Sequence, residues 1–440
     1  MQENVDVCII GGGVVGLFCA IEAVEAGKTV RVVDKTFIGA SRHNIGELIQ
    51  QGHHSDFLPL VTYAQKRWQR AMTSLETNLG LEPRGSVYLA RTPAQLEHLR
   101  ALVKQEQEAG HDTKLIEDRA ELLAVLGVTS LNDTVLGGRL SPGDMAIDTS
   151  VAMDSLRRVA TLKGVRMWGD DEVVDLIVDG QTVKGVRTRV GEECHATETI
   201  IAAGVWSTKL LEKLDLKLPM RPARCHLVEV SPTNKVPKQL VTYPSKTGDI
   251  IAKYLNSGRV LMSYTGLRDQ AQATWFTRVD SRAVRAMMSG FSGLLPCFQH
   301  ARMRGVSTVS LAVTPDQHPY LGRPVNYNGL LVAVGFNGKS YAVAAGVAKI
   351  MSDLILGQEP RVDLRAFALE RFRKDTPTPA PREALTTATA EEEAPPPAPA
   401  DTAPEDTENA DAAGAENHIK EADGEVSSDT DIGAFIPDKA

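Results

Sequence analysis

The sequence predicts an α/β protein in which a second, mostly antiparallel α+β domain is inserted into the first. At the N-terminus a short apolar strand pattern, a G-x-G-x-x-G run and a helical pattern follow one another, as in a βαβ unit. Between residues 218 and 300, strand patterns alternate without helices between them, which is typical of antiparallel pairing. A second glycine-rich turn at 335–340 then opens another helical pattern, so the chain returns to the first domain.

The N-terminal unit predicts a nucleotide site of the Rossmann type. Residues 5–10 are apolar and β-branched, and the glycines that follow allow a tight turn, close approach to a pyrophosphate and packing of the next helix. That helix, expected at about 14–26, directs its N-terminal N–H groups at the phosphates. The next strand, 29–33, ends at Asp34, whose carboxylate suits a ribose diol. The three glycines of the run are Gly11, Gly13 and Gly16.

The middle of the chain alternates helical and strand patterns. Trp68 and Met72 lie on the apolar stripe of a long helix and are expected in the core. Asp148 precedes an apolar-periodic run and is expected to cap that helix rather than do chemistry. The expected elements, in order, are helix 54–79, strand 86–90, helix 93–109, a strand region at 137–147, a helix to 162, strands 172–178 and 183–188 around a turn, strand 199–202, strands 226–230, 250–254 and 259–264, strand 329–334 and helix 341–356.

Charge and composition separate a C-terminal tail from the body. The formal net charge of −8 is unevenly spread, because residues 376–440 alone carry about −13 and the preceding residues about +5. The tail is rich in Ala, Pro, Thr and Glu and is expected to be disordered. We therefore expect a discontinuous nucleotide-binding domain (1–85, 141–218 and 305–375), a substrate domain (86–140 and 219–304) and the tail, which could bind a protein partner.

Other features of the sequence bear on the possible partners and the cellular location of the protein. The body shows no basic stripe for a nucleic acid, no apolar run long enough for a membrane span and no basic leader, so no signal peptide is expected. Five cysteines without C-x-x-C or metal spacing favour a reducing compartment, hence the cytoplasm, and no metal site.

Four ordered blocks resemble the D-amino-acid-oxidase family of flavoproteins, in its sarcosine oxidase and glycine oxidase branch. The blocks are GGGVVG with Asp34, Gly39-Ala40-Ser41, IIAAGVWS ending at Ser207, and TPDQHPYLG with GFNGK. The segment 366–372, AFALERF, resembles the end of sarcosine oxidase β-subunits, which suggests a hetero-oligomer. The resemblance implies FAD, with its adenylate end at residues 11–16 and its ring near 40–41 and 335–340. The implied FAD contacts are Gly11, Gly13, Val14, Val15, Gly16, Asp34, Lys35, Ala40, Ser41, Val173, Val174, Ala203, Gly204, Trp206, Gly335, Asn337, Gly338, Lys339 and Ser340.

The resemblance also implies a reaction: oxidation of an amine or amino acid at the carbon that bears nitrogen, by hydride transfer to flavin N5. The resulting imine hydrolyses, and oxygen or another acceptor takes the electrons. Related branches oxidise 2-hydroxy acids, which gives a second hypothesis. A third is a non-catalytic flavin-binding subunit whose tail recruits a partner.

The chain departs from the family at several positions. Residues 309–313 contain neither the Arg that holds the substrate carboxylate in several relatives nor the Cys that tethers FAD in others. Ile147 stands where β-subunits attach a second flavin, so one non-covalent FAD is expected. Strand 259–264 lacks the Lys that some relatives use with oxygen, and Lys339 replaces a common His.

Four residues are therefore candidates for holding the substrate. Arg42, His43 and Lys339 are expected in loops beside the ring, and Tyr264 could add a hydroxyl from the second domain. A buried carboxylate needs such a cation and hydrogen bonds. Each residue also has a purely structural interpretation: Arg42 and Lys339 as solvent-facing charges, His43 as a loop brace, Tyr264 as core. His318 is interpreted as structural.

Overall fold

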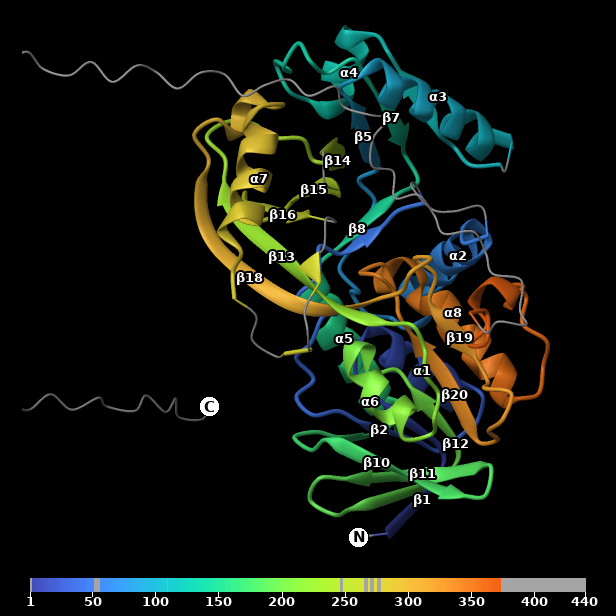
Figure 1. Ribbon diagram of the computed structural model, residues 1–440. Helices are drawn as coiled ribbons and strands as arrows, with labels where there is room; N and C mark the ends of the chain where they lie inside the picture. Colours follow the sequence, from blue (N-terminus) through green and yellow to red (C-terminus); the bar gives the residue numbers. More distant parts are fainter. Residues whose placement is uncertain are drawn as a thin grey trace, which may run out of the picture. The chain divides into compact units, whose positions relative to one another are not determined.

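The computed structural model describes residues 2–50, 56–108, 110–245, 248–264, 268–269, 273–274 and 278–372 (Figure 1). The acidic tail expected at 376–440 lies outside these residues. All of the described residues belong to one compact unit. The division of the body into a nucleotide-binding and a substrate domain stays a prediction.

An eight-stranded sheet carries the N-terminal glycine turn. Its central part consists of five strands that pair in parallel, with the first strand of the chain in the middle. An antiparallel hairpin extends one side of this parallel part. Along the main path the strands are β10 (Val173–Asp179), β11 (Thr182–Thr188), β12 (Glu193–Ile201), β1 (Gln2–Ile10), β2 (Val30–Val33) and β9 (Arg166–Trp168), with β20 (Leu330–Val334) beside β12 and β19 (Tyr320–Gly322) beside β20.

Both faces of this sheet are covered, as parallel strands require. Alternate residues of β1 enter two different cores: Val7 and Ile9 pack with the helices on one face, and Cys8 and Ile10 pack on the other. The helices of the first face are α1 (Val14–Glu25), α2 (Leu58–Ser74), α5 (Thr149–Leu162) and α8 (Ser340–Ile355), and the second face carries α6 (Ser207–Glu212) with the 3-10 turn η1 (Gly204–Trp206).

A second sheet has nine strands. Its strand pairings are antiparallel except for that of β14 with β5. Its strands are β17 (Arg268–Asp269), β13 (Arg221–Ser231), β16 (Val260–Tyr264), β15 (Gly248–Tyr254), β14 (Leu240–Ser245), β5 (Ser86–Ala90), β7 (Gly137–Ser141) and β6 (Lys114–Ile116), with β18 (Arg302–Val313) beside β13. Helix α7 (Ser281–Ser292) packs against β13 and β16 (Figure 1). Helices α3 (Pro93–Glu108) and α4 (Arg119–Leu126) and the turns η2 (Pro296–Phe298) and η3 (Arg365–Phe367) complete the elements.

A small three-stranded sheet completes the strand pairings: β3 (Glu47–Leu48) and β4 (Leu81–Glu82) both pair with β8 (Met145–Ile147). Its middle strand, β8, leads straight into α5. The Asp148 carboxylate accepts hydrogen bonds from the N–H groups of Ser150 and Val151 at the start of that helix, which confirms the predicted cap.

The predicted fold class, a Rossmann-type α/β domain with a second, mostly antiparallel sheet, is confirmed. The sequence analysis was wrong in giving the region 218–300 no helices, because α7 lies there. It also missed α4, and the strand region expected at 137–147 is two strands of different sheets.

Candidate functional site

A cavity with a volume of about 1090 Å³ begins at the glycine turn after β1. It is also bordered by the loop that follows β2, the carboxyl end of β12 and residues 308–310 of β18. Ligands of open α/β sheets bind at this carboxyl edge. The predicted residues that line the cavity are Gly11, Gly13, Asp34, Lys35, Ala40, Ser41, Val173, Val174, Ala203, Gly204, Trp206 and His43.

The glycine turn is shaped as a phosphate cradle. Gly11 has a φ of +107°, and a Cβ there would lie 2.5 Å from the carbonyl oxygen of Ala202. A Cβ on Gly16 would lie 1.9 Å from the carbonyl oxygen of Gly11. Gly13 at the helix cap has no side chain to cover the first turn of α1, where the N–H of Val14 donates to the hydroxyl of Ser41 at 3.0 Å. These features fit a dinucleotide phosphate at the positive end of α1. Val14, Val15 and Gly16 lie in that first turn, buried behind the cavity wall.

Asp34 joins the glycine turn to the loop after β2. One carboxylate oxygen accepts the N–H of Gly12 at 2.7 Å, and the other accepts the N–H groups of Thr36 and Phe37 at 2.9 and 2.5 Å. These bonds fix the carboxylate at the cavity wall, where Oδ2 keeps one further lone pair for a hydroxyl donor.

Four cations line the β10 end of the cavity, and of these the sequence analysis selected only Lys35. Glu172 holds the ammonium of Lys35 and the guanidinium of Arg189, at 3.0 and 2.5 Å. Lys209 and Lys213 of α6 line the same cavity. Basic groups around a cavity raise the local concentration of anionic ligands, as a diphosphate cofactor would be. They come from three separate elements, so no sequence motif unites them.

The other end of the site lies where residues 40–44 meet the turn before α8. Asn44 donates its amide N–H to the carbonyl oxygen of Gly338 at 3.1 Å, and the Tyr341 hydroxyl donates to the carbonyl oxygen of Ser41 at 2.7 Å. Asn337 donates its backbone N–H to Ala312 of β18. Residues about 300 positions apart are thus held together. In this turn the predicted contacts are Gly335, Asn337, Gly338, Lys339 and Ser340; none of them lines the cavity itself.

A buried ion pair holds the loop 314–318 that packs behind this turn. Arg371 is 1% exposed. Its guanidinium donates hydrogen bonds to both carboxylate oxygens of Asp316, at 2.7 and 3.1 Å, and to the carbonyl oxygen of His318 at 2.8 Å. Burial raises the pKa of Asp316, but the hydrogen bonds and charge of Arg371 outweigh it and lower that pKa. The position of His318 in this cluster is consistent with the structural role that the sequence suggested for it.

The four predicted substrate residues are not brought together. His43 is exposed and lines the cavity. Arg42 does not line it: its guanidinium pairs with both carboxylate oxygens of Asp154, at 2.7 and 3.1 Å. Lys339 is half-buried at the N-cap of α8. Tyr264 is 7% exposed and lies in the core beneath α7, so the structure does not bring it to the cavity.

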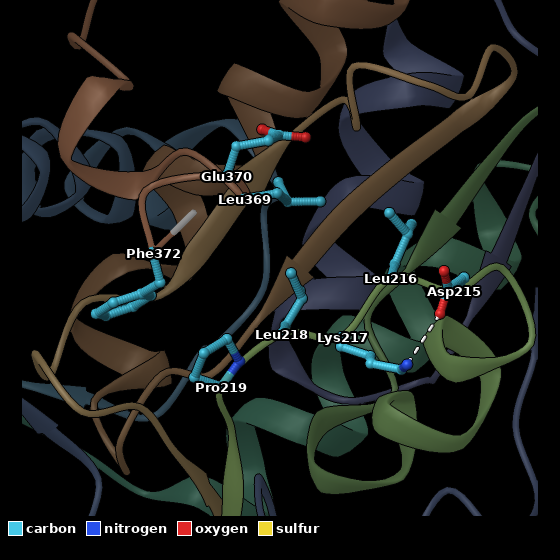
Figure 2. A pocket seen from close by; sticks show the side chains of 8 residues that line it. All are labelled: Asp215, Leu216, Lys217, Leu218, Pro219, Leu369, Glu370 and Phe372. Carbon is cyan, nitrogen blue, oxygen red and sulfur yellow. Dashed lines mark ion pairs between the residues drawn. The ribbon is translucent and has the colours of Figure 1, made fainter. Parts of the chain in front are cut away.

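A smaller cavity of about 180 Å³ lies away from these residues, between the segment 215–219 and the last described residues of the chain. Figure 2 shows mainly apolar side chains around it, and the one ion pair drawn joins Lys217 to Asp215 at 3.2 Å. It contains none of the predicted site residues. Among the residues that the structure describes, no helix is both long and apolar enough to cross a bilayer.

Comparisons with known proteins agree with this geometry. Residues 6–354 match the family described as DAO, FAD dependent oxidoreductase. The D-amino acid dehydrogenase of Methylobacterium sp. (strain 4-46) is 23% identical over 84% of this chain and 99% of its own. The glycine oxidase of Geobacillus kaustophilus (strain HTA426) is 25% identical over 84% of this chain and 98% of its own. The solved structure of L-proline dehydrogenase from P. horikoshii superposes with a TM-score of 0.78 at 20% identity, covering 86% of this chain and all of the other.

Proposed function

The chain belongs to the FAD-dependent oxidoreductase family DAO, and from that premise we propose that it oxidises the C–N bond of an amino acid or secondary amine, with one non-covalently bound FAD. Sarcosine-, glycine- and opine-like compounds are the proposed substrates. The relatives named above support this class, and the observation that carries the proposal is the cavity that begins at the glycine turn and continues to Ser41 and β18.

FAD, when bound, would supply the chemistry by accepting a hydride from the substrate carbon. The residues of this chain would bind and orient it. Gly13 and the N-terminus of α1 would hold the diphosphate, Asp34 the ribose, and Ala40, Ser41 and the turn before α8 the ring. The positive end of α8 would stabilise negative charge beside that turn, since no N-cap side chain accepts a hydrogen bond from its first turn.

The apolar surroundings of Ala40 would keep water from the reacting atoms. Ala40 packs against a cluster of β13 and β18 residues, namely Ala223, Cys225, Val309, Leu311 and Val313. Three members of this cluster belong to residues 309–313, which contain no cysteine for a covalent tether, and this supports the non-covalent cofactor.

Two measurements test the proposal. The purified protein should show a flavin absorbance spectrum, and the chromophore should separate from the chain on denaturation. Anaerobic incubation with sarcosine, glycine, proline, opines and D-amino acids should then bleach it. If the protein binds FAD and none of these compounds bleaches it, the substrate class is wrong.

A second candidate function is oxidation of a 2-hydroxy acid. It is favoured by His43, an exposed imidazole at the cavity, because alcohol oxidation needs a base for the hydroxyl proton. Bleaching by 2-hydroxyglutarate that is lost in His43→Ala would support it. A cytoplasmic location, the electron acceptor, a hetero-oligomer and a non-catalytic subunit whose tail binds a partner stay predictions.

A further inference from the structure

One residue of the cavity wall has an unusual backbone conformation. Phe37 lines the cavity and has a φ of +51°, in the left-handed region that bulky side chains rarely adopt. Its backbone N–H donates to Oδ1 of Asp34 at 2.5 Å, and this bond helps to hold the loop in that conformation. Strained residues persist where their surroundings fix them, and they are concentrated at sites that bind ligands. The backbone of Phe37 therefore directs attention to its side chain.

The ring of Phe37 is held between two glycines. A Cβ on Gly12, in the glycine turn, would lie 2.5 Å from Cδ1 and Cε1 of the ring. A Cβ on Gly169, directly after β9, would lie 2.7 Å from Cε2 on the opposite edge. Side chains at either position would collide with the ring, so the close approach of the backbone on both sides depends on glycine. Both edges of the ring are thus in contact with backbone.

The faces of the ring have different surroundings. Phe37 packs against the core that contains the buried side of α1, yet it is only half-buried and borders the cavity. Since both edges are held by backbone and the core lies to one side, a face of the ring remains for the cavity. A flat aromatic face at a cavity wall is a surface on which another planar ring can stack.

The loop after β2 runs beside the segment that follows β9. The N–H of Asp34 donates to the carbonyl oxygen of Trp168 at 3.0 Å, and the ammonium of Lys35 pairs with Glu172 at 3.0 Å. Phe37 and its glycine partner lie between these two contacts in sequence, so the ring belongs to a fixed part of the wall. The cavity-lining residues of the two segments are Asp34, Lys35, Thr36, Phe37, Ile38, Glu172, Val173 and Val174.

We propose that the adenine of FAD stacks on the open face of the Phe37 ring, which makes Phe37 a residue that selects the base of the cofactor. The inference goes beyond the proposed function, because it concerns the cofactor and holds whichever substrate is oxidised. Asp34, which accepts the N–H of Phe37, would hold the neighbouring ribose. Base and sugar would then be held by one loop.

The charges near Phe37 favour an uncharged base over a second phosphate group. Glu172 holds Lys35 and Arg189 in ion pairs, so a carboxylate lies between two of the cations that line this end. A phosphate would have to compete with that carboxylate for both cations. A base carries no such charge, and it gains from the apolar side chains of Ile38 and Val173, which line the same end.

Displacement of FAD from the loaded protein tests the inference with two nucleotides. ADP and CDP share ribose and diphosphate and differ in the base, and a purine covers more of an aromatic face than a pyrimidine does. The FAD released at each nucleotide concentration is measured in the filtrate after ultrafiltration. For the wild type, half-displacement should need about 10-fold less ADP than CDP.

Substitutions of Phe37 should change this preference in a defined order. Leucine keeps a Cβ and therefore the backbone strain, so Phe37→Leu removes only the flat ring and should reduce the 10-fold preference to about 2-fold. Phe37→Tyr keeps the ring and should keep the preference. Gly169→Ala leaves every cavity residue in place but pushes on the edge of the ring, and it should also reduce the preference.

The matched control is Phe372→Leu, the same substitution at a half-buried phenylalanine beside the smaller cavity. It should leave the preference for ADP at the wild-type value. A reduced preference in this variant would overturn the inference, because the change would then not be specific to the wall that Phe37 forms.

The inference is also overturned if the wild type shows no preference, or if Phe37→Leu, with FAD content equal to that of the wild type, keeps it. An equal loss of ADP and CDP would overturn it too, since the ring would then only support the glycine turn. Should Phe37→Leu not retain FAD, Gly169→Ala decides: a reduced preference supports the inference, and an unchanged one overturns it. Failure of every amine to bleach the flavin refutes the proposed function alone, because displacement of FAD needs no substrate.

Discussion

Replacing Glu47 with Gln should make the protein more stable at alkaline pH, because the wild type carries a buried carboxylate whose pKa is raised. The pKa of Glu47 is about 7 in the folded chain, against an ordinary value of 4.5. The folded state therefore binds the proton more tightly than the unfolded state. The resulting penalty is absent below pH 4.5, grows between 4.5 and 7, and is complete above 7.

The magnitude follows from the two pKa values. At 1.36 kcal/mol per pH unit, the difference corresponds to roughly 3 kcal/mol of unfolding free energy above pH 7. The unfolding entropy of an ordered body of this length is on the order of 0.8 kcal/mol/K, so the melting temperature should change by about 4 °C. Burying the glutamine amide also costs free energy, but this cost does not change with pH. The quantity to measure is therefore how the difference in melting temperature between Glu47→Gln and the wild type changes with pH.

The assay is thermal unfolding of the FAD-saturated protein at pH 5 to 8.5, followed by circular dichroism. The melting temperature of Glu47→Gln relative to the wild type should rise by several degrees between pH 5 and pH 8. The exposed Glu97→Gln should follow the wild type throughout. Parallel curves for Glu47→Gln and the wild type would refute the assignment of an ionised, unpaired carboxylate at this position.

Three further changes test other parts of the structure. Arg371→Met leaves the buried carboxylate of Asp316 without its partner and should cost about 3 to 5 kcal/mol in chemical denaturation, partly recovered by adding Asp316→Asn. Gly16→Ala places a methyl group 1.9 Å from the carbonyl oxygen of Gly11 and should weaken FAD at least about 10-fold, measured by equilibrium dialysis. Asp34→Ala removes the acceptor of three backbone N–H groups and should also weaken FAD about 10-fold or more, while activity per bound FAD is unchanged.

The sequence predicted those parts of the site that are made by neighbouring residues. Strand, glycine turn, helix and Asp34 follow one another within about 30 positions, so their order alone specifies the geometry. The turn before α8 was found for the same reason, from its glycines and the helical pattern after it. By contrast α7 was missed: Ala283, Met287 and Phe291 recur at helical spacing, but the serines and the glycine of this segment are poor helix formers.

Tyr264 illustrates a second limit of sequence-based prediction, which concerns the face of the sheet on which a strand residue lies. A shift by one position exchanges the faces of a sheet, and sequence alone does not say which face of β16 meets the cofactor. In the structure the Ser263 hydroxyl lies 3.5 Å from the Cys225 thiol, whereas Tyr264 points into the core beneath α7. Tyr264 thus lies on the face of β16 opposite to that of Ser263.

Glu47 could not be selected from the sequence because nothing local marks it. β3 is only two residues long, and the groups that set the protonation of Glu47 come from β15, from the N-cap of α8 and from the turn between β7 and β8. The absence of an arginine from residues 309–313 indicated only that something was missing. Arg42 is held by Asp154, and the charge of Lys339 lowers the pKa of Glu47, an effect that only the folded structure shows.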